Sequence, residues 1–281
     1  MFSMAYLRAC GLVLFLLGFF LFGVPTQMVL RRFGTARMQT WLVILFHRGL
    51  CRLLRLRVRA VGSPASVPTL MLAPNHVSWT DISVLGGLYP LSFLAKSEVG
   101  TWPIIGPMAR LCGTIFVVRG RRTAIPAVNA QLAAHMRRGD RVVLFAEGTT
   151  GDGNRLMKFH SSHFEAAKIA LRDGDVWVQP VSIAYMRRDG LPLGRIGRMQ
   201  VAWYGDMTLA PHLWDLLRDG PVDCVVSFDE PVQVTQAMTR KDLCAAVRMT
   251  TRTRLGELVH GHAADVKPVG TNVGLIASPA E

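Results

Sequence analysis

A histidine and an aspartate placed five positions apart are the residues of this chain best suited to acid–base chemistry. His76 and Asp81 lie in the run APNHVSWTD, residues 73–81. A carboxylate that accepts a hydrogen bond from one imidazole nitrogen fixes the tautomer of the ring, and the other nitrogen can then remove a proton from a hydroxyl. Such general-base catalysis contributes roughly 10²–10⁴ in rate. The chain contains no Gly-x-Ser-x-Gly segment, which favours direct attack by a substrate hydroxyl.

The two side chains can meet only in one local geometry. Five residues on a regular helix correspond to a rotation of about 140°, so His76 must precede a helix and Asp81 must lie in its first turn. The spacing Ser78-x-x-Asp81 is typical of a capping box with Ser78 as the N-cap residue. A capping box also permits a purely structural interpretation, in which Asp81 caps a helix and His76 is a surface residue. The spacing alone leaves both interpretations open.

Three later segments place polar residues at or near the ends of apolar runs. IFVVRG (115–120) contains Arg119, whose guanidinium suits an anion or, alternatively, a capping salt bridge. LFAEGT (144–149) brings Glu147 into a loop that either lines a polar site or forms an ordinary solvated turn. VQPV (178–181) places a proline in an apolar run.

In this order, the four segments resemble the four motifs of the glycerolipid acyltransferase family, which contains the 1-acyl-sn-glycerol-3-phosphate acyltransferases. The resemblance covers residues 68–182. It implies that His76 and Asp81 are catalytic and that an arginine of the second motif binds the phosphate of the acceptor. The residues that it assigns to substrate binding are Asn75, Phe116, Arg119, Gly120, Glu147, Gly148, Thr149 and Pro180.

The resemblance implies a membrane-bound O-acyltransferase that uses no metal or cofactor. The donor would be acyl-CoA or acyl-carrier protein, and the acceptor would be a lysophospholipid, first of all 1-acyl-sn-glycerol-3-phosphate, which yields phosphatidic acid. A non-catalytic lipid-binding protein on the same scaffold is an alternative from another class. A soluble hydrolase lacks a nucleophile and leaves the apolar N-terminal segment unexplained.

One departure from the family pattern concerns the acceptor. The third motif commonly runs Pro-Glu-Gly-Thr-Arg, whereas this chain has AEGTTGDG (146–153), with Thr150 in place of the basic residue. Arg155 and Lys158 follow closely and are candidates to compensate. Enzymes of the family that complete ornithine lipids, by acylating a lyso-ornithine lipid, carry a similar Glu-Gly-Thr-Thr-x-Asp-Gly run. A lyso-ornithine lipid is therefore the leading alternative acceptor.

Short β-type runs alternate with helical ones after residue 59, which predicts an α/β domain with a mostly parallel central sheet flanked by helices. The expected strands are 56–61, 69–73, 91–95, 114–118, 141–145, 177–185, 199–204 and 223–228. The expected helices are 80–88, 104–111, 124–138, 162–172, 210–217 and 240–259. We expect residues 1–58 to form membrane-associated helices, residues 59–262 the catalytic domain and residues 263–281 a flexible tail.

The N-terminal segment combines apolar and basic residues. Residues 9–26 form an uncharged stretch of 18 residues, close to the ~17–25 needed to span a bilayer. A second stretch, 41–54, carries Arg48, Arg52 and Arg55 on one side and resembles an interfacial amphipathic helix. A signal peptide, a single spanning helix and a helical hairpin are the competing interpretations. The fold class therefore includes an N-terminal two-helix membrane-anchoring element.

The charge distribution favours a membrane as the partner of this segment. The formal net charge is +13, and the first 60 residues contain nine arginines and no acidic residue. Anionic headgroups attract such a segment by about 1 kcal/mol per basic residue. The arginines that follow the apolar stretch place the catalytic domain on the cytoplasmic side of the cell inner membrane. Nucleic acid is not expected as a partner, because no known nucleic-acid-binding motif is present.

The remaining ligand-type residues give weak signals. The five cysteines are scattered without metal-ligand spacing, as expected for buried free thiols in a reducing compartment. His160 and His163 are three positions apart but have no third ligand nearby, so we expect them to lie on a solvated helix start.

Overall fold

A single sheet carries the loop that contains His76 and Asp81. The computed structural model describes residues 2–102, 105–111, 113–117 and 122–260, and within them the strands of the sheet follow the order β1-β8-β6-β2-β5-β3-β4. Their bounds are β1 Leu56–Val61, β2 Leu70–Pro74, β3 Ser92–Lys96, β4 Ile115–Val117, β5 Val142–Val143, β6 Trp177–Arg188 and β8 Val222–Phe228. Two short strands, β7 (Leu191–Pro192) and β9 (Val232–Gln233), pair antiparallel with β6.

Most of the pairings are parallel. β2 lies between β5 and β6, parallel to both, and β3 joins β5 to β4 in the same sense. β8 is parallel to β1 and antiparallel to β6. The predicted α/β class with a mostly parallel sheet is therefore confirmed.

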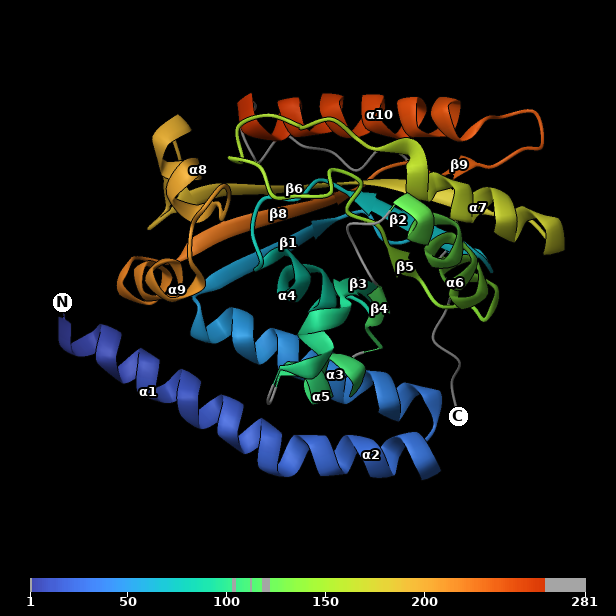
Figure 1. Cartoon of the computed structure of the whole chain (residues 1–281). Helices are drawn as coiled ribbons and strands as arrows, with labels where there is room; N and C mark the ends of the chain where they lie inside the picture. Colours follow the sequence, from blue (N-terminus) through green and yellow to red (C-terminus); the bar gives the residue numbers. More distant parts are fainter. Residues whose placement is uncertain (1, 103–104, 112, 118–121, 261–281) are drawn as a thin grey trace, which may run out of the picture.

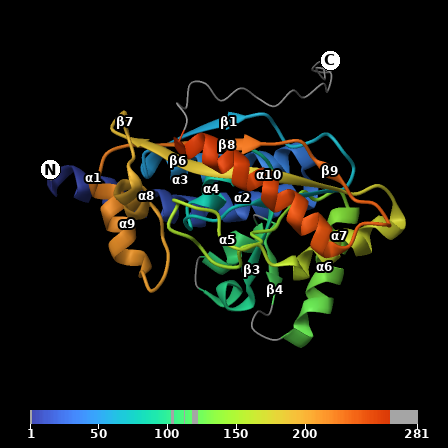
Figure 2. The same cartoon turned by 90° about the horizontal axis from the view of Figure 1, so that it is seen from above.

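Helices cover both faces of the sheet. α6 (Ile125–Arg137), α7 (Glu165–Ala170) and α10 (Arg240–His260) lie on one face, and α4 (Asp81–Gly86) and α9 (Leu209–Arg218) lie on the other (Figures 1 and 2). The central strand β2 is apolar on both faces and so needs cover on both. Leu70 and Leu72 belong to one core cluster, and Met71 and Ala73 belong to the other. Successive strand side chains point to opposite faces, so a strand buried on both faces reads as a continuous apolar run.

Two sequence-based element assignments are wrong. Residues 199–204 were expected to form a strand, but most of them belong to α8 (Arg195–Val201) or to the loop after it. Arg198 stabilises this short helix by donating to the Leu193 carbonyl at 2.7 Å and to Asn154 Oδ1 at 2.9 Å. The helix expected at 162–172 is interrupted, because 3₁₀ turns at Ser161–Phe164 and Leu171–Asp173 flank α7.

The N-terminal segment forms two antiparallel helical arms. α1 (Phe2–Gly18) continues through a π-helical turn (Phe19–Gly23) into α2 (Val24–Phe33), and α3 (Ala36–Leu53) runs back against both. Within the part of the chain that the structure describes, one helix, Met4–Phe33, is long and apolar enough to cross a membrane. β1 begins at Leu56, so the sheet includes the last three residues of the expected N-terminal element. The expected tail, 263–281, lies outside the described residues.

Both ends of the long apolar helix lie against the part of the chain that contains the sheet. At its start, Arg8 Nη1 donates to the Leu217 carbonyl at 2.8 Å, and the rings of Tyr6 and Trp214 are 5.0 Å apart. Leu217 and Trp214 belong to α9. At its other end, α2 contacts α5 (Ile105–Leu111). The helix therefore runs along the base of the domain instead of pointing away from it (Figure 1).

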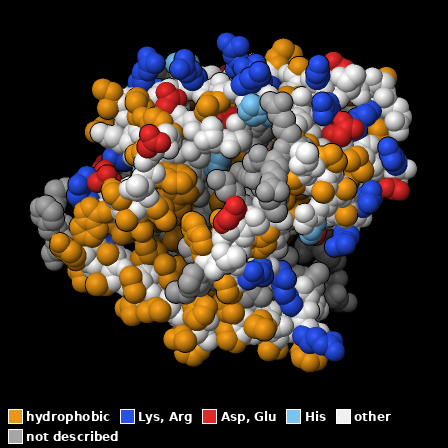
Figure 3. All heavy atoms as spheres, viewed as in Figure 1, with side chains coloured by type: hydrophobic (Ala, Val, Ile, Leu, Met, Phe, Trp, Pro, Cys, Tyr) orange, Lys and Arg blue, Asp and Glu red, His pale blue; other side chains and the backbone are white. Residues whose placement is uncertain are grey.

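The outer face of these helices is apolar. Large hydrophobic side chains that are 41–80% exposed gather on α1 to α3, and in Figure 3 they form the orange area at the lower left. They are Met4, Tyr6, Leu7, Val13, Leu14, Leu17, Leu21, Phe22, Met28, Val29, Phe33, Met38, Trp41 and Leu45. An exposed apolar area of this kind marks a membrane or protein contact surface.

Candidate active site

The loop that carries His76 begins where β2 ends. Pro74 is the last residue of β2, and the next residue, Asn75, is 2% exposed. The Asn75 side chain amide donates to the Ile183 carbonyl at 3.0 Å, and its oxygen accepts from the Ile183 amide at 2.7 Å. Both polar groups of Asn75 are thus bound to β6, which fixes the start of the loop. The structure gives Asn75 a positioning contact, and its predicted contact with substrate stays a prediction.

His76 and Asp81 form the expected pair. His76 Nδ1 lies 2.8 Å from Asp81 Oδ2, with the histidine side chain 18% exposed and the aspartate fully buried. The same oxygen accepts from the backbone amides of Val77 at 2.6 Å and Ser78 at 3.0 Å. An ionised carboxylate accepts only, so Nδ1 carries the proton and Nε2 is the nitrogen available as a base.

The local geometry corrects one detail of the expected capping box. α4 begins at Asp81 itself and Thr80 precedes it, so Ser78 is not the N-cap residue. The Asp81 backbone amide donates a hydrogen bond to the backbone carbonyl of Ser78 and not to the Ser78 hydroxyl. Asp81 reaches back to two preceding amides, which folds the loop so that His76 meets it although five positions separate them.

A tyrosine and a threonine complete the surroundings of the aspartate. The Tyr185 hydroxyl on β6 donates to Asp81 Oδ1 at 2.7 Å and lies 2.6 Å from Thr80 Oγ1. Because the tyrosine proton goes to the carboxylate, Thr80 is the donor to Tyr185. Burial and the nearby Asp81 charge raise the pKa of Tyr185 well above its usual value, so it stays a donor. Motif spacing did not identify Tyr185, which lies 104 positions after Asp81.

The segment after β5 holds the histidine from the other side. The Phe145 ring stacks on the His76 ring with centroids 3.9 Å apart and an interplanar angle of 20°. The Gly151 amide donates to the His76 carbonyl at 2.8 Å. Gly148 turns this loop with a φ of +73°, a value that favours glycine. Phe145 is a second residue that motif spacing did not identify.

Glu147 is buried next to the histidine. It is 4% exposed, and burial raises the pKa of its carboxyl to about 8, an effect to which the Asp81 charge adds. Hydrogen bonds from the backbone amides of His76 and Met157 act in the opposite direction. Burial therefore favours the neutral form of Glu147, and its carboxyl links the backbone of His76 to that of Met157.

The other expected binding residues are dispersed. Gly148 and Thr149 are exposed on the loop beside His76. Pro180 is buried within β6, paired with Ala73 of β2. Phe116 lies on β4, where its ring faces the Arg110 guanidinium at 5.6 Å. Arg119 and Gly120 lie outside the described residues.

Positive charge near Glu147 comes from an unexpected element. Arg155 and Lys158, the expected compensating residues, are exposed. Arg248 on α10 acts on the Glu147 carboxyl and favours its charged form. Arg248 Nε is buried without a hydrogen-bond partner among the described residues. Arg248 is 98 positions beyond Thr150, so motif spacing had no means to identify it.

The described residues contain no group of three or more metal-ligand side chains. His160 is exposed, and His163 Nδ1 is 2.9 Å from Asn129 Oδ1. Cys51, Cys224 and Cys244 are buried free thiols as expected, whereas Cys10 is exposed.

Comparisons with known proteins identify the family of the chain. The profile of the Acyltransferase family matches residues 59–184. A lyso-ornithine lipid O-acyltransferase of Brucella abortus is 44% identical over 77% of this chain and 82% of that protein. A lyso-ornithine lipid O-acyltransferase of Rhizobium meliloti is 39% identical, over 90% and 87%. A 1-acyl-sn-glycerol-3-phosphate acyltransferase of Neisseria gonorrhoeae is 32% identical, over 60% and 63%.

A solved structure supports the fold. The crystal structure of the 1-acyl-sn-glycerophosphate acyltransferase PlsC from Thermotoga maritima superposes with a TM-score of 0.65 at 19% identity, covering 91% of this chain and 98% of that one. The chain therefore belongs to the acyltransferase family that includes the lyso-ornithine lipid and 1-acyl-sn-glycerol-3-phosphate acyltransferases, and it is an enzyme that acylates a lysolipid.

Proposed function

We propose that this enzyme transfers a fatty acyl group from an acyl thioester to the hydroxyl of a lyso-ornithine lipid at a membrane surface. The observation that carries the proposal is the bond of 2.8 Å between His76 Nδ1 and Asp81 Oδ2, which leaves Nε2 as the available base. Acyl-CoA or acyl-carrier protein is the donor in this proposal.

The reaction needs no covalent enzyme intermediate. The acceptor hydroxyl attacks the thioester carbonyl while His76 Nε2 takes its proton. The tetrahedral intermediate then collapses, the carbon–sulfur bond breaks, and the imidazolium returns the proton to the leaving thiolate. Asp81 stabilises the positive charge that forms on the imidazole between the two steps. Stacking on Phe145 and the bond from Gly151 keep the ring and its backbone in position.

The acceptor is assigned from the loop next to His76. Thr150 stands where the glycerol phosphate enzymes commonly have a basic residue, and it removes a cation suited to a phosphate. An ornithine joined to lipid through its α-amino group retains one carboxylate and one ammonium. In our proposal Arg248, whose charge acts on the Glu147 carboxyl, binds that carboxylate of the ornithine. The 44% and 39% identical relatives are both named lyso-ornithine lipid O-acyltransferases.

A lysophosphatidic acid acceptor is the second candidate. The exposed Arg155 and Lys158 favour it, because both follow the same loop and present positive charge to solvent. The family resemblance put this acceptor first. We place it second because the departure at Thr150 lies within the motif that is assigned to the acceptor.

We propose that residues 1–58 act as the membrane-anchoring element, residues 59–262 as the catalytic domain and residues 263–281 as a tail. In this proposal the long apolar helix lies within one leaflet, because its start contacts α9 and its end contacts α5. A helix that crossed the bilayer would separate these ends by about 30 Å of hydrocarbon. The catalytic domain then faces the cytoplasm at the inner membrane.

The test offers a labelled acyl thioester to the purified, detergent-solubilised chain with lyso-ornithine lipid and lysophosphatidic acid in parallel. We expect acylation of lyso-ornithine lipid and a loss of at least ~10²-fold in kcat for His76→Ala. Arg248→Gln is expected to raise the KM for lyso-ornithine lipid about tenfold with kcat nearly unchanged, as for a lost charged hydrogen bond.

The chain offers matched controls for both variants. His135 Nδ1 on α6 lies 2.7 Å from Oδ2 of Asp140, which follows that helix, and the two residues have the same spacing as His76 and Asp81, so His135→Ala should keep full activity. Arg252 is exposed one turn beyond Arg248, so Arg252→Gln should keep the KM. Equal activity of His76→Ala and the unaltered chain would refute the general base. Preference for lysophosphatidic acid would refute the proposed acceptor and would leave the general-base role of His76 intact.

A further inference from the structure

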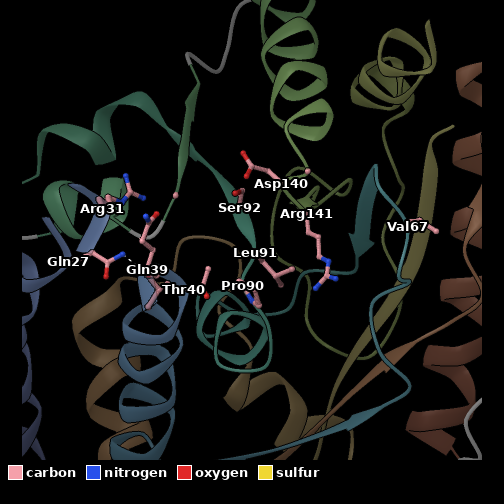
Figure 4. Close-up of a pocket in the computed structure, with 13 residues that line it drawn as sticks. Gln27, Arg31, Gln39, Thr40, Val67, Pro90, Leu91, Ser92, Asp140 and Arg141 are labelled. Atoms are coloured by element: carbon pink, nitrogen blue, oxygen red, sulfur yellow. Dashed lines mark hydrogen bonds between the residues drawn. The ribbon is translucent and has the colours of Figure 1, made fainter. Parts of the chain in front are cut away.

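A hollow lies at the opposite end of the parallel strands from His76. Its volume is about 540 Å³. Residues of α2 and α3 line one side, and the starts of β3 and β5 line the other (Figure 4). β2, β3 and β5 run parallel, and His76 follows the end of β2. The hollow, named here the hairpin pocket, is therefore distinct from the catalytic site.

One side chain in the hairpin pocket has an unused hydrogen-bonding group. Gln27 is 2% exposed, and its Nε2 donates to the Gln39 carbonyl at 2.7 Å, as Figure 4 shows. Its Oε1 is buried without a partner among the described residues. A buried acceptor without a donor costs free energy, so a ligand that donates a hydrogen bond there is stabilised.

The charge of the hairpin pocket favours an anion. Arg31 and Arg141 both line it and lie on opposite sides in Figure 4. Asp140 is the acidic residue of the lining, and its carboxylate already accepts a bond from His135 Nδ1 at 2.7 Å. The lining therefore carries net positive charge, and the planar guanidinium fork of arginine matches the oxygens of a phosphodiester.

The helices beside the hairpin pocket belong to the apolar surface described above. Val29 and Phe33 on α2 are 57% and 80% exposed, and Met38 and Trp41 on α3 are 48% and 61% exposed. If these side chains enter a bilayer, a polar hollow between the same helices and the sheet lies near the level of the headgroups. This step rests on the membrane association in the proposed function.

We propose that the hairpin pocket binds the headgroup of an anionic phospholipid. The phosphodiester lies against Arg141, with Arg31 adding positive charge, and a headgroup hydroxyl donates to Gln27 Oε1. A phosphatidylglycerol-type headgroup has this combination of one negative charge and hydroxyl donors. The bound lipid joins the turn between α2 and α3 to the start of the sheet and so fixes the anchoring helices against the catalytic domain.

The test measures the Tm of the full chain in a neutral detergent as dihexanoyl phosphatidylglycerol is added. A ligand that binds only the folded state raises Tm saturably, and we expect a rise on the order of 2–4 °C. Arg141→Gln should abolish this rise. Gln27→Met, which keeps the side chain shape and removes the acceptor, should weaken the apparent affinity at least about tenfold. Arg172→Gln, an exposed arginine elsewhere, should respond like the unaltered chain.

Other probes define the results that overturn the proposal. Dihexanoyl phosphatidylcholine, which lacks net charge and donors, should give no rise, and an equal rise would indicate a detergent effect. An equal rise in Tm with dihexanoyl phosphatidylethanolamine, which carries no net charge, would overturn the claim that the pocket selects an anionic headgroup. An equal rise with glycerophosphoglycerol, which has no acyl chains, would overturn the claim that the ligand is a lipid. Acyl transfer to the lysolipid acceptor by Arg141→Gln, in detergent without added phosphatidylglycerol, should be unchanged, so failure of this proposal is distinguishable from failure of the proposed function.

Discussion

At the scale of single residues, His76 is held by segments that are far apart in the sequence. Asp81 comes from its own loop, whereas Phe145 and Gly151 come from the segment after β5. Tyr185 comes from β6 and acts through Asp81. Only the first of these contacts has a local signal, namely the five-residue spacing. The others arise because parallel pairing brings the ends of β2 and β5 together beside β6, and this pairing is not visible in a single sequence.

Tyr185 gives the first prediction at this scale. Tyr185→Phe removes the hydrogen bond to Asp81 Oδ1 and keeps the ring, so the carboxylate loses one of its constraints. A hydrogen bond to a charged group contributes about 1.5–3 kcal/mol, and we expect kcat to fall about tenfold or more with KM nearly unchanged. Steady-state kinetics check this. Tyr89→Phe, which changes a half-buried tyrosine packed on Phe228, is the control and should keep its kcat. A rise in KM alone would contradict the positioning role.

Glu147 gives a prediction about pH. Burial raises the pKa of its carboxyl to about 8, whereas an unfolded chain releases the proton near 4.5. Between these values the folded state binds more protons, so the contribution of this group to stability is full below pH 4.5 and is lost as pH rises to about 8. The Glu147→Gln variant stays neutral, so its free energy of unfolding should fall less between pH 4.5 and 8 than that of the unaltered chain. The difference between the two falls is on the order of a few kcal/mol.

Thermal unfolding of both proteins at several pH values from 5 to 8.5 measures this difference. Asp242→Asn serves as the control, because Asp242 is exposed and hydrogen bonds to Thr239 lower the pKa of its carboxyl below that window. Parallel pH dependence in Glu147→Gln and the unaltered chain would show that the glutamate is already ionised in the folded state.

At the scale of elements, the sequence predicted the strands better than the short helices. β1 occurs at the expected bounds, because a strand of six residues with a polar outer face has a clear pattern. α8 was missed because Met-Gln-Val-Ala-Trp-Tyr alternates like a strand, while bonds from Arg198 to Leu193 and Asn154 stabilise a helix. Tertiary contacts of this kind override a short local pattern.

The helices α1 to α3 give the prediction at this scale. Leu14 and Leu21 are 69% and 60% exposed on the outer face, so a double change to aspartate should weaken binding to anionic vesicles by at least about tenfold. Vesicle flotation measures the bound fraction. Leu191 on β7 is 72% exposed, and Leu191→Asp should leave flotation unchanged. Equal flotation of all three proteins would exclude the outer face as the membrane contact.

At the scale of the whole molecule, the loop that contains His76 and Asp81 and the apolar helices both contact α9. Trp79, two positions before Asp81, donates from Nε1 to His212 Nδ1 at 3.1 Å. His212 lies on α9, the same helix that receives Arg8 and Tyr6 from α1. Burial lowers the pKa of His212, and its Nε2 lies 3.1 Å from the Val201 carbonyl, so the neutral ring links α9 to the end of α8. The overall class of fold was predictable from the alternation of elements, but this cross-connection was not, because it depends on which helix packs at the edge of the sheet.

The pairing of β1 with β8 has a consequence for biosynthesis. Leu56 pairs with Val222, 166 positions later, so β1 has no partner until most of the chain has left the ribosome. At about 5–20 residues per second this delay is roughly 10–30 s. During that time the apolar α1 to α3 are already outside the ribosome without a completed sheet to pack against. We therefore expect these helices to meet a bilayer or a chaperone before the enzyme has folded, and to make the nascent chain prone to aggregation where neither is present.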